Sequence, residues 1–149
     1  MSFFRAMNIS ASGLTAQSAR LDVIAENIAN VSTTKTEDGT PYKAKSVLFQ
    51  EKDNTSFTPF SDYFNNAVGT YNNGQGVRVS SIVEDSSQGE LVFDPEHPDA
   101  DENGYVEQSN VNIVKEMVNM ISASRAYESN ITAMNTTKSM VSKTMEIGQ

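Results

Sequence analysis

Apolar residues recur with helical spacing along the N-terminal segment, and this regularity constrains the fold more than any other feature of the chain. The stripe consists of Met7, Leu14, Leu21 and Ile28, with Ile24 and Val31 in neighbouring helical positions. Residues seven apart lie on one face of an α-helix, so the pattern predicts a helix from about Ser2 to Asn30, roughly 45 Å long at 1.5 Å per residue.

The C-terminal segment carries a second stripe, in which spacings of three and four residues alternate. Its apolar members are Met117, Met120, Tyr127, Ile131, Met134, Val141 and Met145, and Val114, Val118 and Ile121 widen the stripe near its start. This alternation is the heptad pattern of helices that pack along a seam, with Ser124 and Lys138 as polar positions. Either Asn112 or Ser109 is suited to cap the first turn. The pattern predicts a helix from about Asn112 to Glu146.

Two long helices with narrow apolar stripes pose an energetic problem for so short a chain. We expect them to pack as an antiparallel coiled coil, but this contact hides only part of each stripe. The segment between them is short beside helices of about 45 Å and would not cover the remainder. We therefore expect these sixteen stripe residues to form interfaces, both within the chain and with copies or partners that carry the same pattern.

The segment between the stripes has the composition of β structure. The stretch "PYKAKSVLFQE" (41–51) predicts a strand, and "GVRVSSIVED" followed by "ELVF" predicts a hairpin around Ser86 to Gly89. Aromatic residues gathered between Phe57 and Tyr71 indicate a structured loop or a docking segment. The predicted fold is α+β, with an N-terminal helix in residues 1–33, a β-rich middle segment in 34–104 and a C-terminal helix in 105–149.

The charge of the chain argues against nucleic acid as a partner. The 149 residues include 19 acidic and 11 basic ones, for a net charge of −8. Nine of the acidic residues lie between Val79 and Val114, where no Lys or Arg occurs. Such a chain lacks the cations that neutralise phosphates, so no nucleic-acid binding is expected.

Part of this acidic segment has the spacing of a calcium loop. The matching residues are Asp99, Asp101, Asn103 and Gly104. The twelfth position of an EF-hand loop requires a bidentate Glu, and here it is Asn110. Pro95 and Pro98 also prevent the helix that enters such a loop. We therefore expect an extended acidic connector with weak, diffuse cation binding, and a calcium-binding module stays as the alternative.

No residue pattern supports enzymatic activity, a cofactor or a small-molecule substrate. The chain has no cysteine and a single histidine, His97, and it lacks a phosphate-binding glycine loop, a nucleophile elbow and a zinc-binding helix motif. The N-terminal segment has no continuous apolar core of a secretory signal, and no stretch of about 20 apolar residues occurs. On these grounds alone a cytosolic protein is expected.

The terminal segments resemble a known family. The stretch "NISASGLTAQSARLDVIAENIANVSTT" (8–34) resembles the N-terminal motif shared by bacterial flagellar axial proteins of the rod and hook. The stretch "NVNIVKEMVNMISASRAYESN" (110–130) resembles their C-terminal motif. Together with "HPDADENGYV" (97–106), these motifs make the chain most similar to the flagellar basal-body rod proteins, in particular those of the proximal rod.

The resemblance implies a structural function. A rod protein would be exported unfolded by the flagellar type III apparatus, without signal cleavage, and would assemble helically into the shaft that transmits motor torque. Its partners would be copies of itself, other rod proteins and the export apparatus, while contacts with the membrane-embedded base and surrounding rings are left open. This implication replaces the cytosolic expectation with the periplasmic rod of the flagellar basal body. The alternative is a soluble coiled-coil adaptor that is helical and stable alone.

Overall fold

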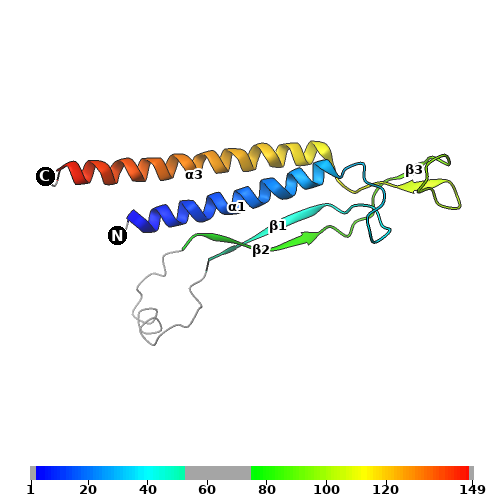
Figure 1. The fold of residues 1–149 in the computed structure, drawn as a ribbon, viewed down its shortest axis with the longest axis horizontal. Helices are drawn as coiled ribbons and strands as arrows, with labels where there is room; N and C mark the ends of the chain where they lie inside the picture. The colour runs from blue at the N-terminus through cyan, green and yellow to red at the C-terminus, as the bar shows by residue number, and fades with distance from the viewer. Residues whose placement is uncertain (1–2, 53–74, 148–149) are drawn as a thin grey trace, which may run out of the picture.

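The protein is an elongated α+β structure built from two long helices, a two-stranded ribbon and a small hairpin (Figure 1). The computed structural model describes residues 3–52 and 75–147. In chain order the elements are α1 (Phe3–Ala29), β1 (Lys45–Glu51), β2 (Val77–Glu84), β3 (Leu91–Phe93), β4 (Tyr105–Glu107) and α3 (Ile113–Ile147). The predicted α+β class with two packed terminal helices is confirmed, and the aromatic residues between Phe57 and Tyr71 lie outside the described residues.

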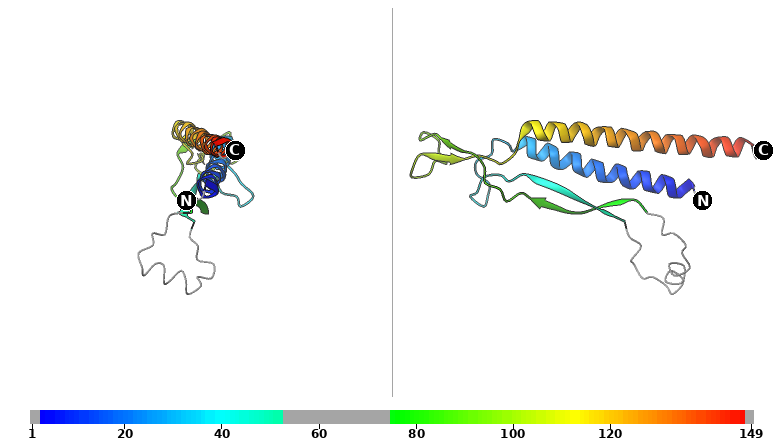
Figure 2. Two further views of the ribbon diagram at one scale, coloured as in Figure 1. Left: turned by 90° about the vertical axis from the view of Figure 1, so that its left-hand side faces the viewer. Right: turned by 180° about the vertical axis from the view of Figure 1, so that it is seen from behind.

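The helices run side by side in opposite directions, so both termini lie at one end of the molecule and the β3–β4 hairpin lies at the other (Figures 1 and 2). The predicted helix bounds agree with the observed ones to within one residue. Of the two proposed caps for α3, Asn112 takes the role, because its Oδ1 accepts a hydrogen bond from the Lys115 N–H at 3.0 Å. Ser109 instead accepts from the Val111 N–H at 3.3 Å.

The strands form two separate antiparallel pairs, β1 with β2 and β3 with β4. The predicted hairpin joining residues 76–85 to 90–93 is therefore wrong. The segment between β2 and β3 does not turn back on itself, because β2 pairs with β1 and the Gln108 N–H, just before α3, donates to the Glu90 carbonyl at 2.9 Å. A Cβ at Gly89 would lie 1.7 Å from the Gln108 carbonyl oxygen, so only glycine admits this close approach.

The buried core is small and lies mainly where α1, the start of the ribbon and the beginning of α3 meet. Its apolar members are Ala16, Val23, Ile24, Tyr42, Val106, Val111 and Ala123. Helix α1 lies between α3 and the β1–β2 ribbon, so it is covered from two sides (Figures 1 and 2). By contrast, much of the surface of α3 that faces away from α1 is left open.

Candidate assembly surface

The face of α3 that packs on α1 is only partly the predicted stripe. A row of less exposed positions follows spacings of four and three residues: Glu116, Met120, Ala123, Tyr127, Asn130, Met134, Thr137 and Val141. The helices approach closely there, since a Cβ at Gly13 would lie 2.8 Å from Asn130 Oδ1 and Ala123 is 0% exposed. Small and polar side chains therefore occupy half of the internal seam.

Within one chain the sixteen predicted stripe residues divide into two groups. Buried or half-buried are Met7, Leu14, Leu21, Ile24, Ile28, Val31, Met120, Tyr127, Met134 and Val141. Exposed are Val114, Met117, Val118, Ile121, Ile131 and Met145. In each heptad of α3 one of the two predicted stripe positions lies in the internal seam, for example Tyr127, and the other is replaced by the residue just before it, for example Asn130 in place of Ile131.

Five of the exposed apolar side chains of α3 form one continuous surface, here called the outer face: Ile113, Val114, Met117, Val118 and Ile121. Val114 is 71% exposed and Val118 is 61% exposed. At about 100° per residue, Val118 points roughly 140° away from the buried Ala123. The outer face thus lies on the side of α3 away from α1, where the described part of the chain does not cover it. A contiguous apolar surface of this kind marks a site of protein contact.

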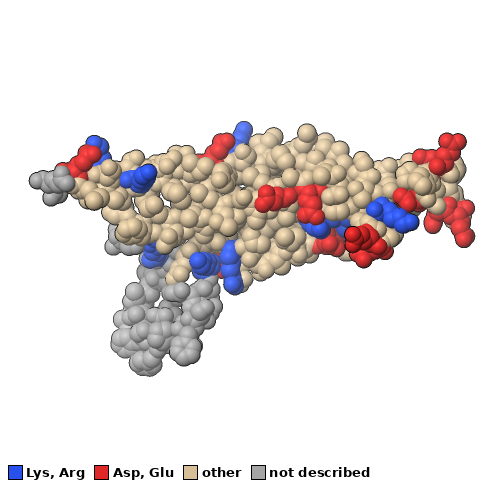
Figure 3. Space-filling view, viewed as in Figure 1, with Lys and Arg blue, Asp and Glu red and all other residues tan. Residues whose placement is uncertain are grey.

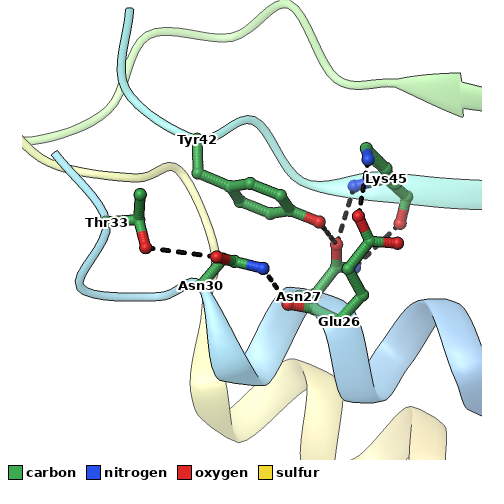
Figure 4. A network of polar contacts seen from close by, with 6 residues as sticks. All are labelled: Glu26, Asn27, Asn30, Thr33, Tyr42 and Lys45. Carbon is green, nitrogen blue, oxygen red and sulfur yellow. Dashed lines mark hydrogen bonds and ion pairs between the residues drawn. The ribbon is translucent and has the colours of Figure 1, made fainter. Parts of the chain in front are cut away.

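The internal contacts of the fold converge on a buried polar residue, Asn27, which is 1% exposed (Figure 4). Its Nδ2 donates to the Lys45 carbonyl at 2.8 Å and to Glu116 Oε2 at 3.2 Å. Its Oδ1 accepts from the Lys45 N–H at 2.9 Å and from the Tyr42 hydroxyl at 3.0 Å. All four hydrogen-bonding positions of the amide are used, so Asn27 joins α1 to β1 and to α3 without an unsatisfied polar atom.

Charged and aromatic side chains surround this junction. Lys45 Nζ lies 2.6 Å from Glu26 Oε1 and 5.5 Å from the centre of the Tyr42 ring. Burial, reinforced by the negative charge of Glu26, raises the pKa of the Tyr42 hydroxyl above its ordinary value of 10.0. The hydrogen bond to Glu26 raises the pKa of Lys45 above 10.5. Both groups therefore hold their protons more tightly in the folded chain than in the unfolded one.

We expect the folded chain to lose stability at alkaline pH because of these two groups. A raised pKa contributes stability that is fully present below the unfolded value and is lost as the pH rises through the folded value. The free energy of unfolding should therefore fall as the pH increases above about 10, and Tyr42→Phe should reduce that fall. Denaturant titrations between pH 8 and 11 measure both profiles. Tyr105→Phe, on the exposed hairpin, is the control, and an identical fall in all three proteins would contradict the assignment.

A second asparagine, Asn110, joins the middle segment to the start of α3. Its Oδ1 accepts from the Ala44 N–H at 2.7 Å. Its Nδ2 donates to the carbonyls of Asp85 and Ser87, each at 3.0 Å. The backbone N–H of Ser87 donates to the Asp85 carboxylate at 3.0 Å, and this hydrogen bond lowers the pKa of the Asp85 carboxyl. Asn110, the residue in the twelfth position of the calcium-like loop, thus fixes the position of the segment between β2 and β3.

The other residues of the calcium-like pattern build the turn of a hairpin, so the expected extended connector is wrong. The Asp101 carbonyl accepts a hydrogen bond from the Gly104 N–H at 2.8 Å, and the Asp101 N–H donates to the Tyr105 carbonyl at 2.9 Å. Gly104 has a positive φ of 80°, which favours glycine. Asp99 accepts from Thr34 Oγ1 at 2.9 Å, and His97 Nδ1 accepts from the Asp99 N–H at 3.1 Å. Among the described residues, no group of three or more acidic or histidine side chains is placed to hold a metal ion.

The sequence did not reveal the two asparagine junctions, at Asn27 and at Asn110. Asn27 stands within the N-terminal stripe, since Ile24, Asn27, Ile28 and Val31 share one helical face. An amide inside an apolar stripe is a signal of a buried polar contact, but it does not identify the partners, which come from β1 and α3.

Neither described helix has a stretch apolar enough to cross a membrane.

Comparisons with known proteins account for both ends of the chain. The family model described as "Flagella basal body rod protein" matches residues 7–35, and that described as "Flagellar basal body rod FlgEFG protein C-terminal" matches residues 102–147. The flagellar basal-body rod protein FlgC of Borreliella burgdorferi is 49% identical over 156 residues, which cover 100% of this chain and 99% of that protein. The chain belongs to the FlgC family of flagellar basal-body rod proteins.

Other members of the FlgC family match over the same extent. The protein of Bacillus subtilis is 46% identical and that of Salmonella typhimurium is 43% identical, and each match covers 100% of both chains. The resemblance inferred from the terminal motifs is thereby confirmed. The protein is a structural subunit of the flagellar basal-body rod and not an enzyme, so the cytosolic expectation is wrong. Its functional surfaces are those that hold subunits together.

Proposed function

We propose that this chain is exported by the flagellar type III apparatus and assembles helically, with copies of itself and other rod proteins, into the periplasmic shaft that transmits motor torque. The proposal rests on membership in the FlgC family and on one structural observation, the outer face of α3. A helix that packs on α1 with one side and exposes an apolar surface on the other can contact a neighbouring subunit through that surface. Such a surface is unfavourable on a free monomer and favourable in an assembly.

The energetics of the outer face suit a repeated contact. Full burial of one Val, Ile or Met side chain contributes about 1.5 to 3 kcal/mol. Five such side chains on each subunit supply enough apolar surface to offset part of the entropic cost of association, and the gain recurs at every copy. When the surface buried on the neighbour differs from the outer face, the contact is heterologous, and it repeats as an open helix where the rotation between subunits does not close into a ring. A torque-bearing shaft requires this kind of repeated, non-closing contact.

The composition also supports export of an unfolded chain. No cysteine is present, so no disulfide can lock a fold before passage through a narrow channel. Among the described residues only a few apolar side chains are buried, and Val23, Ile24 and Tyr42 lie at or near the Asn27 junction. Much of the remaining helical surface gains its partners only on assembly.

The decisive experiment locates the chain in the cell. An epitope tag inserted between residues 53 and 74, which lie between β1 and β2 in the sequence, is imaged in isolated basal bodies by immunogold electron microscopy. We expect label on the rod, and the same label should be missing from basal bodies of a strain without the gene. A tagged, functional chain found only in the cytosol would support the soluble adaptor instead.

In solution we expect the monomer to be ordered at the Asn27 junction and frayed at the terminal end. The first turns of α1 and the last turns of α3 make few buried contacts, and helix formation without partner surface is marginal. Hydrogen exchange of the purified chain should show protected amides around Ile24 and Met120 and rapid exchange before Met7 and after Lys138. Far-ultraviolet circular dichroism should show less helix than the 27 and 35 residues of α1 and α3. Full helix content in a dilute sample would favour the adaptor.

A further inference from the structure

A cleft opens between the middle of α1, strand β1 and the first turns of α3. Its volume is about 290 Å³, just below the range of about 300 to 1,000 Å³ that is usual for small-molecule sites. Val23 and Ile24 on α1 and Val47 and Phe49 on β1 line it with apolar surface, and Phe49 is 37% exposed. A small cleft of this kind suits inserted side chains of a protein partner better than a cofactor.

Three charged side chains line the cleft, and two of them are already engaged within the chain. Lys45 Nζ lies 2.6 Å from Glu26 Oε1 (Figure 4). Glu116 is only 8% exposed, and its two oxygens accept hydrogen bonds from Asn27 Nδ2 at 3.2 Å and from Asn119 Nδ2 at 3.1 Å. Neither group therefore needs a partner from outside the chain.

The third charged side chain of the cleft is Arg20. It is half-buried, and it forms no hydrogen bond or ion pair with any residue that the structure describes. A guanidinium presents its N–H donors as a planar fork, and a carboxylate matches this fork with two parallel hydrogen bonds. In the free chain water solvates the group, but a neighbour that covers it without a carboxylate leaves a buried charge unpaired, which is costly. The cleft thus favours an acidic occupant.

We propose that the cleft receives an aspartate or glutamate side chain, flanked by apolar residues, from a different protein of the rod. The carboxylate pairs with Arg20, while its apolar neighbours cover Val47 and Phe49. Residues 113–121 of α3 supply both the outer face and the cleft residues Glu116 and Asn119, so the same turns of α3 carry two contact surfaces. The inference rests on the proposed function and deepens it, because it names the chemistry of one contact between this chain and its neighbours.

The charge of the chain favours a different protein over a second copy. Each copy carries a net charge of −8, so copies repel one another on average. Acidic side chains gather at the hairpin end of the molecule (Figure 3), where seven acidic residues lie between Glu90 and Glu107. Such a cluster does not match one guanidinium that lies in the same cleft as the Glu116 carboxylate. A less acidic protein that presents a single carboxylate in apolar surroundings does match it.

A photoreactive side chain identifies the occupant. Benzoylphenylalanine is incorporated in place of Phe49, which lines the cleft, and isolated basal bodies are irradiated. Mass spectrometry should find this position joined to a peptide of another rod protein, with an Asp or Glu close to the linked residue. The matched control has benzoylphenylalanine at Leu48, which is 50% exposed and is not among the residues that line the cleft, and it should not give this peptide. Links that reach only a second copy of this chain, or no link to a neighbour, would overturn the proposal.

Removal of the Arg20 charge tests its role. Arg20→Gln keeps a side chain of nearly equal helix propensity and adds no carboxylate beside Glu116. Incorporation into basal bodies, measured by immunoblot and normalised to the amount of chain exported, should fall about tenfold. The Tm of the purified chain should stay unchanged, because Arg20 has no partner among the described residues. Arg20→Lys keeps the charge without the planar fork and should cause a smaller loss.

The controls separate this contact from net charge and from the proposed function. Lys43→Gln removes one positive charge from an exposed position outside the cleft and should leave incorporation unchanged. If the unaltered chain is missing from basal bodies, the proposed function fails. If the unaltered chain is present and Arg20→Gln is incorporated equally well, Arg20 does not bind a carboxylate of a neighbour.

A double-mutant cycle joins the two measurements. The acidic residue of the partner that the photoreactive link identifies is replaced with its amide. This change alone should lower incorporation of the chain about tenfold, and its combination with Arg20→Gln should cause no further loss, because both changes remove the same ion pair. Losses that multiply in the combination would show that the two side chains do not contact each other, and the proposal would fail.

Discussion

Replacing Val118 with aspartate should abolish rod assembly and motility while leaving the free chain folded. Val118 lies at the centre of the outer face of α3, is 61% exposed and points away from α1. The monomer already exposes this position to water, so a carboxylate there costs the isolated fold little. In the assembly, the change removes the apolar gain of about 1.5 to 3 kcal/mol and places a charge where desolvation is costly. The loss recurs at every copy of the subunit.

The measurement compares three properties of one strain: swimming, rods seen by electron microscopy, and export of the chain into the medium. We expect the first two to be lost and the third to be retained, because export acts on an unfolded chain. Thr136→Asp is the matched control. It places the same residue on nearly the same line of α3, about 27 Å from Val118 by helical rise, outside the outer face. Normal rods with Val118→Asp would show that the outer face does not contact a neighbour.

The predicted seam residue Ile131 gives a graded version of this experiment. It stands one position after Asn130, which faces α1, and its side chain is 37% exposed. Ile131→Asp should therefore weaken assembly less than Val118→Asp and should destabilise the monomer slightly. Motility halos in soft agar and thermal unfolding of the purified chain measure the two effects. If the halo of the Ile131→Asp strain were unchanged, we would conclude that Ile131 is not part of the contact surface.

The helices were predictable from the sequence because their signals are local. Heptad spacing, the Asn112 cap and the change of residue types after Asn30 all act within a few residues of one another. The division of the C-terminal stripe was not predictable in this way. Both Asn130 and Ile131 fall near the stripe, and the choice between them depends on Gly13, a residue far away in sequence that leaves room for an amide. When an apolar stripe is wider than one seam, no local sequence feature shows which of its residues pack within the chain and which stay exposed.

The prediction of which strands pair was wrong for the same reason. Leu91 to Phe93 follows Val77 to Glu84 closely in sequence, which favours a local hairpin, but each strand pairs with a segment elsewhere in the chain. Asn110 decides part of this arrangement, since it binds the backbone of Ala44 and of the segment after β2. From sequence alone its position suggested a defective calcium ligand. The calcium-like spacing arose because a tight hairpin turn also requires Asp, Asn and Gly in close succession.

The second large effect is expected for Asn27→Ala, which should destabilise the monomer by about 2 to 4 kcal/mol. The change removes four hydrogen bonds. It leaves the Tyr42 hydroxyl and Glu116 Oε2 without their bonds to Asn27 in a buried region. It also releases the start of β1, whose Lys45 backbone pairs with Asn27 on both its N–H and its carbonyl. The loss is therefore larger than that of a single hydrogen bond, because one side chain holds three elements together.

Denaturant unfolding of the purified chain measures this loss as a lower transition midpoint, and thermal unfolding should show a decrease of roughly 5 to 15 °C in Tm. Asn30→Ala is the matched control. Asn30 lies three residues later in the sequence. Among the described residues its side chain bonds to the Glu26 carbonyl and to Thr33 Oγ1 and joins no other helix or strand, so its removal should cost less than about 1 kcal/mol. Asn27→Asp separates hydrogen bonding from volume, because it keeps the acceptor for Tyr42 and Lys45 but faces Glu116 with a second carboxylate. If Asn27→Asp were as stable as the unaltered chain, the donors of Asn27 would not contribute to the junction.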